Sequence, residues 1–422
     1  MRPDPGIIAK ALAAACESLR PGSAADAVGG ITPSFVASPS SVAEASAVLR
    51  AAAEQGLAVI PRGSGSRLEW GAPASACDLV VDTLGLGQVI EHAVGDLVAR
   101  VQAGARFGDV ASVLARAGQE IALDVPATAT IGGIVADALA GPRRLRYGSP
   151  RDLLIGMTLV RADGTVAHSG GKVVKNVAGY DLGKLLAGSA GTLGLIVEAT
   201  FRLHPLPAAR AWVTAEFPDA GALARAVAAA ANSSLVASAV EVHWAAPAGP
   251  ASVGVLLEGS ADGVAARAGR MAGLLSPGAA AMPDDAATRA AVSPTAPSWW
   301  AGVPAPGDGT LLRVTFWVSA LERVLGAIDG AARQTGIRPV VHGSAGAGLL
   351  YVTVPGPAGP AKVAQLAGIV AGAIPAGRGS VAVVAGQARE RRTSEVPGAA
   401  LMRSVKDRFD PRGRLSPGRT FG

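Results

Sequence analysis

A glycine-dense stretch, Gly170 to Ile196, places the strongest constraint on how this chain can fold. It reads GGKVVKNVAGYDLGKLLAGSAGTLGLI. Glycine adds no side chain to a core and costs backbone entropy, so core packing does not explain this density. Two further glycine-rich turns lie upstream, at Pro61 to Arg67 (PRGSGSR) and Pro126 to Asp137 (PATATIGGIVAD). Because glycines let the backbone approach a flat or phosphorylated ligand closely, the three loops together predict one large nucleotide cofactor held from several sides.

Composition indicates a folded protein of more than one domain. A length of 422 residues allows two or three domains, and half of the residues are hydrophobic while 17% are charged. The most apolar segment, Val363 to Gly377, is shorter than the ~20 residues a bilayer requires and is interrupted by Pro375, so we predict a buried helix there. The N-terminal sequence lacks the features of a secretory signal. Only Cys16 and Cys77 are present, so we expect no disulfide framework and a cytoplasmic location.

The basic charge balance does not indicate nucleic acid. The formal net charge is +6, but lysine and arginine are scattered except in two short clusters, 143–146 and 389–392. Aromatic residues make up only 4% of the chain, which leaves few platforms on which bases could stack. An anionic cofactor and an anionic substrate explain basic clefts equally well.

Local patterns predict single helices mixed with hairpins, which is typical of an α+β fold. Ser41 and Glu44 form a capping box that opens a helix over 42–55, and Gly56 ends it. A short buried strand over 57–60 then leads into the first glycine loop. Further strands are expected at 79–82, 98–102, 153–160, 165–167, 252–258, 311–318 and 349–354, with helices at 107–114, 221–231 and 320–336.

Two prolines in the segment 203–207 indicate a domain boundary. We predict an N-terminal lead over 1–30, a cofactor-binding domain over 31–208, an α+β cap domain over 209–385 and a C-terminal segment over 386–422. This last segment ends in the turn-rich sequence DPRGRLSPGR.

The first two loops offer backbone amides to an anion. In PRGSGSR, Gly63 and Gly65 allow successive amides to form a nest, Ser64 and Ser66 add hydroxyl donors, and Arg62 supplies charge. An ordinary Gly/Ser hairpin is the alternative interpretation.

In PATATIGGIVAD, Thr128 and Thr130 precede Gly132 and Gly133, which open a helix whose N-terminal amides favour phosphate. Neither loop has the Walker A pattern, and no GxGxxG is followed by an acidic residue, so a P-loop or Rossmann motif is not expected.

In order and spacing, these motifs resemble the FAD-binding domain of the PCMH, or vanillyl-alcohol-oxidase-type, flavoproteins. The resemblance rests on the three glycine-rich loops, on Ala140 to Gly156 (AGPRRLRYGSPRDLLIG) and on Lys406 to Arg419 (KDRFDPRGRLSPGR). The combination of AGPRR…GSPRD with KNVAGYDL resembles the E-subunit family of bacterial glycolate oxidases. It implies an α+β fold with a two-subdomain PCMH-type FAD-binding domain, an α+β cap and a C-terminal segment that returns to the FAD domain.

The resemblance implies FAD between the two subdomains, with its pyrophosphate on the first two loops. The first loop has no histidine for a covalent link, so we expect the FAD to be non-covalent. Arg151 with Asp152 can equally be a structural ion pair. The cofactor-binding positions carried over from the family are Arg62, Gly63, Ser64, Gly65, Ser66, Thr128, Ala129, Thr130, Gly132, Gly133, Gly148, Arg151, Asp152, Lys175, Asn176, Gly179, Gly194, Leu195 and Ile196.

The cap departs from the pattern of related 2-hydroxy-acid dehydrogenases, which carry a metal motif of the kind HxGDGNxH. The counterpart here, HGSAGAGLLY, has Leu349 and Tyr351 where Asn and His would stand. We therefore expect no metal site. His342 is the best acid–base candidate of the cap, because imidazole titrates near neutral pH. Arg313 is a candidate carboxylate clamp. Structural roles remain open for both residues.

Three functions remain open at this point. The first is the FAD-binding flavoprotein subunit of a glycolate-oxidising complex, which turns glycolate into glyoxylate. The resemblance implies a homologous catalytic flavoprotein subunit and an iron–sulphur subunit as partners, with attachment to the inner membrane only peripherally and through those partners. The second is a self-sufficient FAD-dependent dehydrogenase for a small 2-hydroxy acid such as D-lactate. The third is a structural subunit whose flavin is redox-idle.

Overall fold

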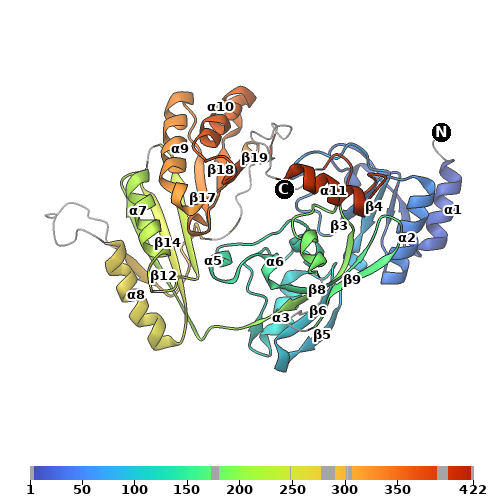
Figure 1. Ribbon diagram of the computed structural model, residues 1–422, viewed down its shortest axis with the longest axis horizontal. Coiled ribbons are helices and arrows are strands. Elements are labelled where there is room, and N and C mark those ends of the chain that lie inside the picture. The colour runs from blue at the N-terminus through green and yellow to red at the C-terminus, as the bar shows by residue number, and fades with distance from the viewer. Residues whose placement is uncertain are drawn as a thin grey trace. The chain divides into compact units, whose positions relative to one another are not determined.

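The computed structural model describes residues 4–172, 180–247, 249–276, 290–300, 302, 307–386 and 398–419 (Figure 1). The chain divides into two compact units. The first unit comprises Met1–Ala140, Ser149–Leu206 and Gly398–Gly422, and the second comprises Gly141–Gly148 and Pro207–Pro397. Each unit therefore contains segments that are distant in the sequence, and the chain passes between the units more than once.

The first unit begins with a small sheet whose strand order is β1-β2-β4-β3. Strands β2 and β3 both run parallel to β4, while β1 is antiparallel to β2. Leu12, Leu49 and Leu79 belong to the core that two helices form on one face of this sheet. The elements are α1 (Pro5–Ala15), β1 (Leu19–Pro21), β2 (Phe35–Ala37), α2 (Val42–Gln55), β3 (Val59–Arg62) and β4 (Leu79–Asp82).

Ser41 caps α2 as predicted, but the capping box is incomplete, because the Glu44 carboxylate accepts from the Ser40 amide at 2.7 Å and not from the Ser41 amide. Ser41 Oγ accepts a hydrogen bond from the Glu44 amide at 3.1 Å, and Gly56 ends the helix at φ +74°. The Leu57 amide still donates to the Ala52 carbonyl at 2.9 Å, so Leu57 completes the helix end. Strand β3 therefore starts two residues later than predicted and runs on to Arg62.

The second sheet of this unit is antiparallel, with strand order β5-β6-β10-β8-β9. The strands predicted at 153–160 and 165–167 correspond to its antiparallel β8–β9 pair. The strands are β5 (Val89–Ala93), β6 (Val98–Gln102), β8 (Leu154–Val160), β9 (Val166–Gly170) and β10 (Leu195–Arg202). The remaining elements are α3 (Phe107–Ala115), α4 (Ile131–Ala136), α6 (Pro150–Leu153) and the two-strand pair β7 (Gln119–Glu120) and β11 (His204–Pro205).

The C-terminal segment packs on the first unit beside β3. Helix α11 (Ala399–Phe409) is followed by a stretch whose Leu415 forms a parallel bridge to Val59. The Val59 amide donates to the Arg414 carbonyl, and the Ser416 amide donates to the Val59 carbonyl, both at 2.9 Å. The end of the chain thus adds backbone pairing to the strand that leads into the first glycine loop.

The second unit is an antiparallel sheet with strand order β15-β12-β14-β13-β17-β18-β16-β19. Four helices pack on one face, where they share a core with alternate strand residues such as Val253 and Leu350 (Figure 1). The strands are β12 (Ala209–Phe217), β13 (Ala239–Ala245), β14 (Ala251–Gly259), β15 (Ala291–Ser293), β16 (Thr310–Phe316), β17 (Val340–Gly343), β18 (Leu349–Val354) and β19 (Gly379–Ala385). The helices are α5 (Arg144–Tyr147), α7 (Ala220–Ala231), α8 (Ala261–Leu275), α9 (Leu321–Thr335) and α10 (Gly359–Gly372), of which all but α5 cover the sheet.

Helix α10 occupies most of the apolar segment of the cap. Its Val363, Leu366, Ala367 and Val370 are buried against the sheet, as the sequence predicts. Within the described part of the chain, no helix combines the length and apolar character needed to cross a membrane. Both units mix helices with mainly antiparallel strands, which confirms the predicted α+β class.

Candidate functional site

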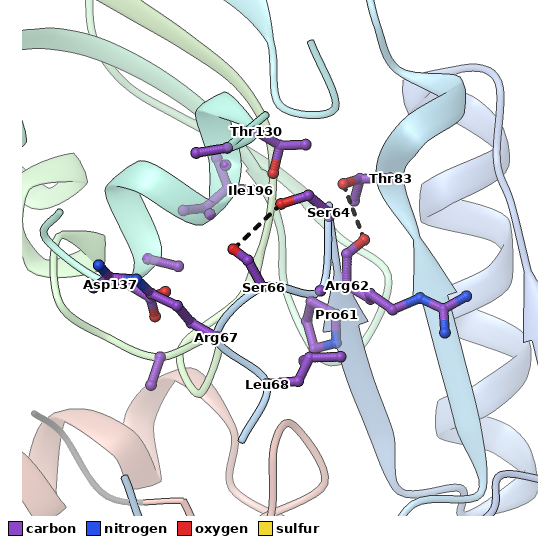
Figure 2. A pocket seen from close by; sticks show the side chains of 18 of the residues that line it. Pro61, Arg62, Ser64, Ser66, Arg67, Leu68, Thr83, Thr130, Asp137 and Ile196 are labelled. Carbon is purple, nitrogen blue, oxygen red and sulfur yellow. Dashed lines mark hydrogen bonds between the residues drawn. The ribbon is translucent and has the colours of Figure 1, made fainter. Parts of the chain in front are cut away.

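The three glycine-rich loops line one trough in the first unit (Figure 2). The trough contains about 770 Å³ of empty space, part of which is open solvent. The convergence expected from the sequence is therefore confirmed. Residues that line the trough are Pro61, Arg62, Gly63, Ser64, Gly65, Ser66, Arg67, Leu68, Thr83, Ala129, Thr130, Gly132, Gly133, Ala136, Asp137, Leu139, Ala190, Gly191, Gly194, Leu195, Ile196 and Arg419.

The first loop has the geometry of an anion nest. Gly65 has φ +74°, a conformation that glycine adopts without strain. Among the described residues, the amides of Ser64, Gly65 and Ser66 donate to no protein acceptor. The hydroxyls of Ser64 and Ser66 lie 3.5 Å apart and face each other in Figure 2. The loop therefore presents adjacent free amides and hydroxyls to the trough, as a phosphate group requires.

The glycines of the first two loops allow close packing of one loop on another. A Cβ placed on Gly63 would lie 2.0 Å from Thr130 Oγ1, so any other residue there would have to displace Thr130. A Cβ on Gly132 would lie 2.9 Å from the Ala103 Cβ, and the Gly132 amide donates to the Ala103 carbonyl at 2.7 Å. Gly63 thus brings the first two loops together, and Gly132 packs the second loop on the residue that follows β6. A Cβ on Gly65 would meet only the side chains of Leu68 and Arg62, at 3.7 Å or more.

The third loop contributes its C-terminal part to the trough. Gly191 has φ +73°, Gly194 precedes β10, and Leu195 and Ile196 are the first two residues of that strand. A Cβ on Gly194 would lie 2.7 Å from Leu159 Cδ1 of the neighbouring strand. The predicted residues Lys175, Asn176 and Gly179 of the same loop lie outside the described residues.

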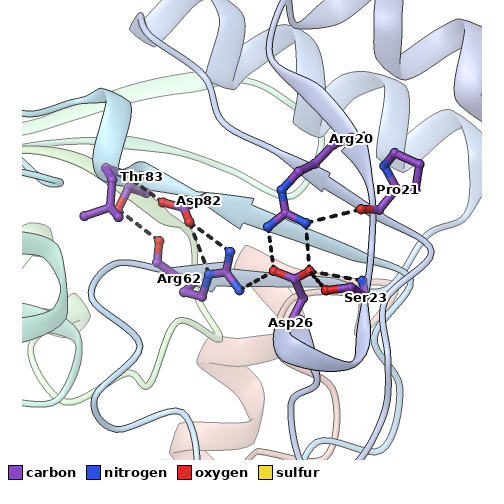
Figure 3. A network of polar contacts seen from close by, with 8 residues as sticks. Arg20, Pro21, Ser23, Asp26, Arg62, Asp82 and Thr83 are labelled. Atoms are coloured by element: carbon purple, nitrogen blue, oxygen red, sulfur yellow. Dashed lines mark hydrogen bonds and ion pairs between the residues drawn. The ribbon is translucent and has the colours of Figure 1, made fainter.

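Arg62 lines the trough, but its guanidinium is engaged elsewhere (Figure 3). It donates to Asp26 at 3.0 Å and to Asp82 at 2.9 and 3.2 Å. Hydrogen bonds from Arg20, Ser23 and Arg62 hold the pKa of the Asp26 carboxyl well below its usual range. Because the side chain of Asp26 is 5% exposed, removing its partners would leave a buried charge at a cost of about 3–5 kcal/mol. The positive charge of Arg62 therefore anchors the end of β3.

Several predicted positions lie away from the trough. Thr128 does not line it, although Ala129 and Thr130 do. Gly148 belongs to the second unit. The Asp152 carboxylate accepts hydrogen bonds from the Ser149 amide at 2.7 Å and the Ser149 hydroxyl at 2.9 Å, so it caps α6. Arg151 lies in the same short helix and is exposed.

Sequence reasoning did not select several residues that line the trough. Gly191, Asp137 and Arg419 all belong to motifs that the sequence made conspicuous, but none was assigned to the site. Asp137 and Arg67 point toward each other in Figure 2, and the Arg67 guanidinium lies 4.1 Å from the centre of the Trp70 ring. Besides Arg62, the trough thus combines two arginines, one carboxylate and free backbone amides.

In the second unit, the two candidate catalytic residues lie on the sheet face that the helices leave uncovered. Strand register places His243, His342, Tyr351 and Arg313 side by side across β13, β17, β18 and β16. The Nε of Arg313 is buried, and no hydrogen-bond partner for it occurs in the described residues. These side chains form a polar row, which we call the cap row.

Tryptophans cover part of the cap row. The ring of Trp299 stacks on His243 with centroids 5.7 Å apart, and it meets His342 edge-on at 6.4 Å. Gly254 makes room for this loop, since a Cβ there would lie 2.8 Å from Trp299 and 2.9 Å from Trp300. His342 is consequently only 6% exposed.

Burial changes the acid–base properties expected of His342. Desolvation, with the nearby His243 as a smaller cause, lowers the pKa of His342 to about 4, despite a hydrogen bond to the Gly302 backbone. Burial also lowers the pKa of His243. The premise that His342 titrates near neutral pH is therefore wrong, and its imidazole is neutral at pH 7. Among the described residues, no three His, Cys, Asp or Glu side chains group as metal ligands would.

Comparisons with known proteins identify two regions of the chain. Residues 33–170 match the family model of the FAD binding domain, and residues 312–420 match that of the C-terminal domain of FAD linked oxidases. The three glycine loops lie within or just after the first match, and Arg419 lies within the second. The cofactor of this chain is FAD.

Curated relatives match the chain over less than half its length. Glycolate oxidase subunit GlcD of Bacillus subtilis is 34% identical over 197 residues, which cover 46% of this chain and 42% of that protein. A D-2-hydroxyglutarate dehydrogenase of Xanthomonas citri is 36% identical over 42% of this chain and 38% of its own length. A D-lactate dehydrogenase of Archaeoglobus fulgidus is 37% identical over 40% of this chain and 38% of its own length. The matched region thus spans about two fifths of these relatives.

Solved structures show the same fold at low sequence identity. Substrate-bound p-cresol methylhydroxylase has a TM-score of 0.76 at 15% identity, covering 98% of this chain and 96% of that chain. A chitooligosaccharide oxidase has a TM-score of 0.69 at 14% identity, covering 98% and 99%. The chain has the PCMH-type flavoprotein fold.

The trough fits the diphosphate of FAD. Free amides from Ser64 to Ser66, hydroxyls from two serines and the guanidinium groups of Arg67 and Arg419 are the donors that a diphosphate accepts.

We expect Gly65→Val to abolish retention of FAD, because the valine side chain would enter the trough at the nest. Gly71→Val is the matched control. Gly71 has the same φ of +74° and open space around it, but it does not line the trough. The FAD-to-protein ratio after gel filtration measures the effect. Equal FAD content in the two variants would contradict the position assigned to the first loop.

We also expect His342 to lower the stability of the second unit against unfolding as the pH falls. The pKa of His342 is about 4 in the folded protein and about 6.5 in an unfolded chain. Between these values the unfolded chain binds more protons, so stability rises with pH across the window and about 3 kcal/mol is lost as the pH falls to 4.

The test compares urea midpoints at pH 7 and pH 4 in the wild type and in His342→Gln. Tryptophan fluorescence reports on the second unit, which carries all the tryptophans except Trp70. The variant should lose less stability on acidification than the wild type, and His92→Gln in the first unit should not. An identical loss in wild type and His342→Gln would refute the burial argument.

Proposed function

We propose that this chain is an FAD-dependent oxidoreductase for the CH–OH group of a short 2-hydroxy acid, acting as the FAD-binding flavoprotein subunit of a glycolate-oxidising complex. The observation that carries the proposal is the trough with its free amides, in a region that matches an FAD-binding family model. Relatives named as a glycolate oxidase subunit and as dehydrogenases of D-lactate and D-2-hydroxyglutarate support the substrate class.

The first unit holds and orients the cofactor in this proposal. When bound, FAD supplies a ring that accepts a hydride from the substrate carbon. The amides of Ser64, Gly65 and Ser66 bind the diphosphate, and the packing of Gly63 against Thr130 keeps the first two loops at a constant separation. Residues Gly194 to Ile196 form the wall contributed by β10.

The substrate hydroxyl must also lose a proton, and the cap row provides limited means for this step. His342 is neutral at pH 7, and a nitrogen that does not bond the Gly302 backbone can accept a proton. However, at 6% exposure it meets a substrate only if the covering tryptophans move. A carboxylate could pair with Arg313, whose Nε is unpaired among the described residues.

The covered cap row favours a subunit over a self-sufficient enzyme. A homologous catalytic flavoprotein subunit would then bind the substrate, and an iron–sulphur subunit would accept the electrons. Cys16 and Cys77 are both buried and free, and two cysteines are too few to hold a cluster in this chain. Such a complex would attach to the inner membrane only through its other subunits.

A self-sufficient 2-hydroxy-acid dehydrogenase is the second candidate. Its support is that relatives named as D-lactate and D-2-hydroxyglutarate dehydrogenases match as well as the glycolate oxidase subunit does. The unpaired Nε of Arg313 beside Tyr351 in the cap row also favours a carboxylate site in this chain.

The experiment is anaerobic reduction of the purified, FAD-loaded chain by glycolate and by D-lactate. We expect bound FAD that neither acid reduces until a homologous catalytic subunit is added. Turnover by the isolated chain would reject the subunit role in favour of the self-sufficient enzyme. FAD that remains oxidised even in the assembled complex would leave only a structural role. A chain that retains no FAD would overturn the proposal as a whole.

A further inference from the structure

The C-terminal segment inserts an arginine into the trough. Arg419 lines the trough together with the first loop, although the two are more than 350 positions apart in the chain. Its Nη2 donates to the Trp70 carbonyl at 2.7 Å and to the Arg67 carbonyl at 3.4 Å. Arg67 is the last residue of PRGSGSR, and Trp70 follows it three positions later. The guanidinium is thus attached to the backbone just beyond the nest.

The segment that carries Arg419 is held in place along its length. Its pairing with Val59 continues as a hydrogen bond from the Ser75 amide to the Pro417 carbonyl at 2.9 Å. Gly418 has φ +82°, and a Cβ there would lie 2.6 Å from the Ser75 nitrogen. Ser416 Oγ donates to the carbonyl of Gly191, itself a lining residue, at 3.3 Å. These contacts leave Arg419 little freedom to lie elsewhere.

Among the described residues, no carboxylate forms a direct ion pair with Arg419. Asp137 and Glu69 act on it only through space, and burial lowers the pKa of its guanidinium. Its two hydrogen bonds use Nη2, and the Nε and Nη1 donors have no acceptor among the described residues. Arg419 is partly buried, and its unused donors are available to an anion that binds beside it. Arg62, by contrast, already shares its charge with two carboxylates.

We propose that Arg419 is the cation that binds the diphosphate of FAD, and that the C-terminal segment is therefore part of the cofactor site. The inference rests on the proposed binding of FAD in the trough. Arg67 contributes less, because its guanidinium lies over Trp70 and points toward Asp137. Arg62 is a positioning residue that keeps the first loop in place.

The test measures binding of FAD, ADP and riboflavin to the full-length apoprotein by fluorescence titration, with ADP as a competitor. Arg419→Gln removes the charge while it keeps a donor for the Trp70 carbonyl. Arg419→Lys keeps the charge but loses the planar guanidinium that can donate two parallel hydrogen bonds. Arg412→Ala is the matched control, because Arg412 lies on the same segment and is exposed.

We expect Arg419→Gln to weaken FAD and ADP about 10- to 100-fold and to leave riboflavin, which has no phosphate, unchanged. It should also reduce the salt dependence of FAD binding. Arg419→Lys should restore part of the affinity, and Arg412→Ala should match the wild type.

Two results would overturn the inference. In the first, Arg419→Gln binds FAD as tightly as Arg412→Ala. In the second, it weakens riboflavin as much as FAD, which indicates a purely structural role. The unfolding midpoints of the apoproteins show whether the variants fold, and Arg419→Lys decides the question if the glutamine variant does not. A wild-type chain that fails to bind FAD would instead reject the proposed function.

Discussion

The buried ion pairs of Arg62 determine where the first loop lies. The guanidinium of Arg62 donates to the carboxylates of Asp26 and Asp82 on either side of it. These bonds fix the end of β3, where the chain leaves the sheet. From that point the backbone turns through Gly63 and Gly65 and presents free amides to the trough. If this anchor moved, the packing of Gly63 on Thr130 and the contacts of Trp70 with Arg419 would move with it. The ion pairs of Arg62 with Asp26 and Asp82 therefore fix the position of the whole cofactor site.

The site is assembled from segments that are remote in sequence and that hold one another in place through hydrogen bonds. The C-terminal segment pairs with β3, closes on the turn after the first loop and touches Gly191 of the third. The match of residues 312–420 to a C-terminal domain model of FAD linked oxidases includes this segment. The first unit is therefore built from both the N-terminal and the C-terminal parts of the chain. The second unit is inserted between them, and its cap row is covered by its own tryptophans.

Much of this architecture could be predicted from local sequence patterns. The helix over 42–55, the strands 79–82 and 98–102 and the convergence of the glycine loops all follow from capping, periodicity and glycine content. What could not be predicted depends on contacts across the fold. The engagement of Arg62 by Asp26 and Asp82, the pKa of His342 and the position of Arg419 are set by distant partners, and no local pattern records them. The roles of Lys175, Asn176 and Gly179 remain predictions, since they lie outside the described residues.

Binding of FAD in the trough depends on free backbone amides that bind its diphosphate. Amide hydrogen exchange of Ser64, Gly65 and Ser66, measured in the full-length chain with and without FAD, tests this claim directly. The account predicts that all three amides exchange rapidly in the apoprotein and become strongly protected when FAD binds. Unchanged exchange at these positions in a chain that has bound FAD would contradict it.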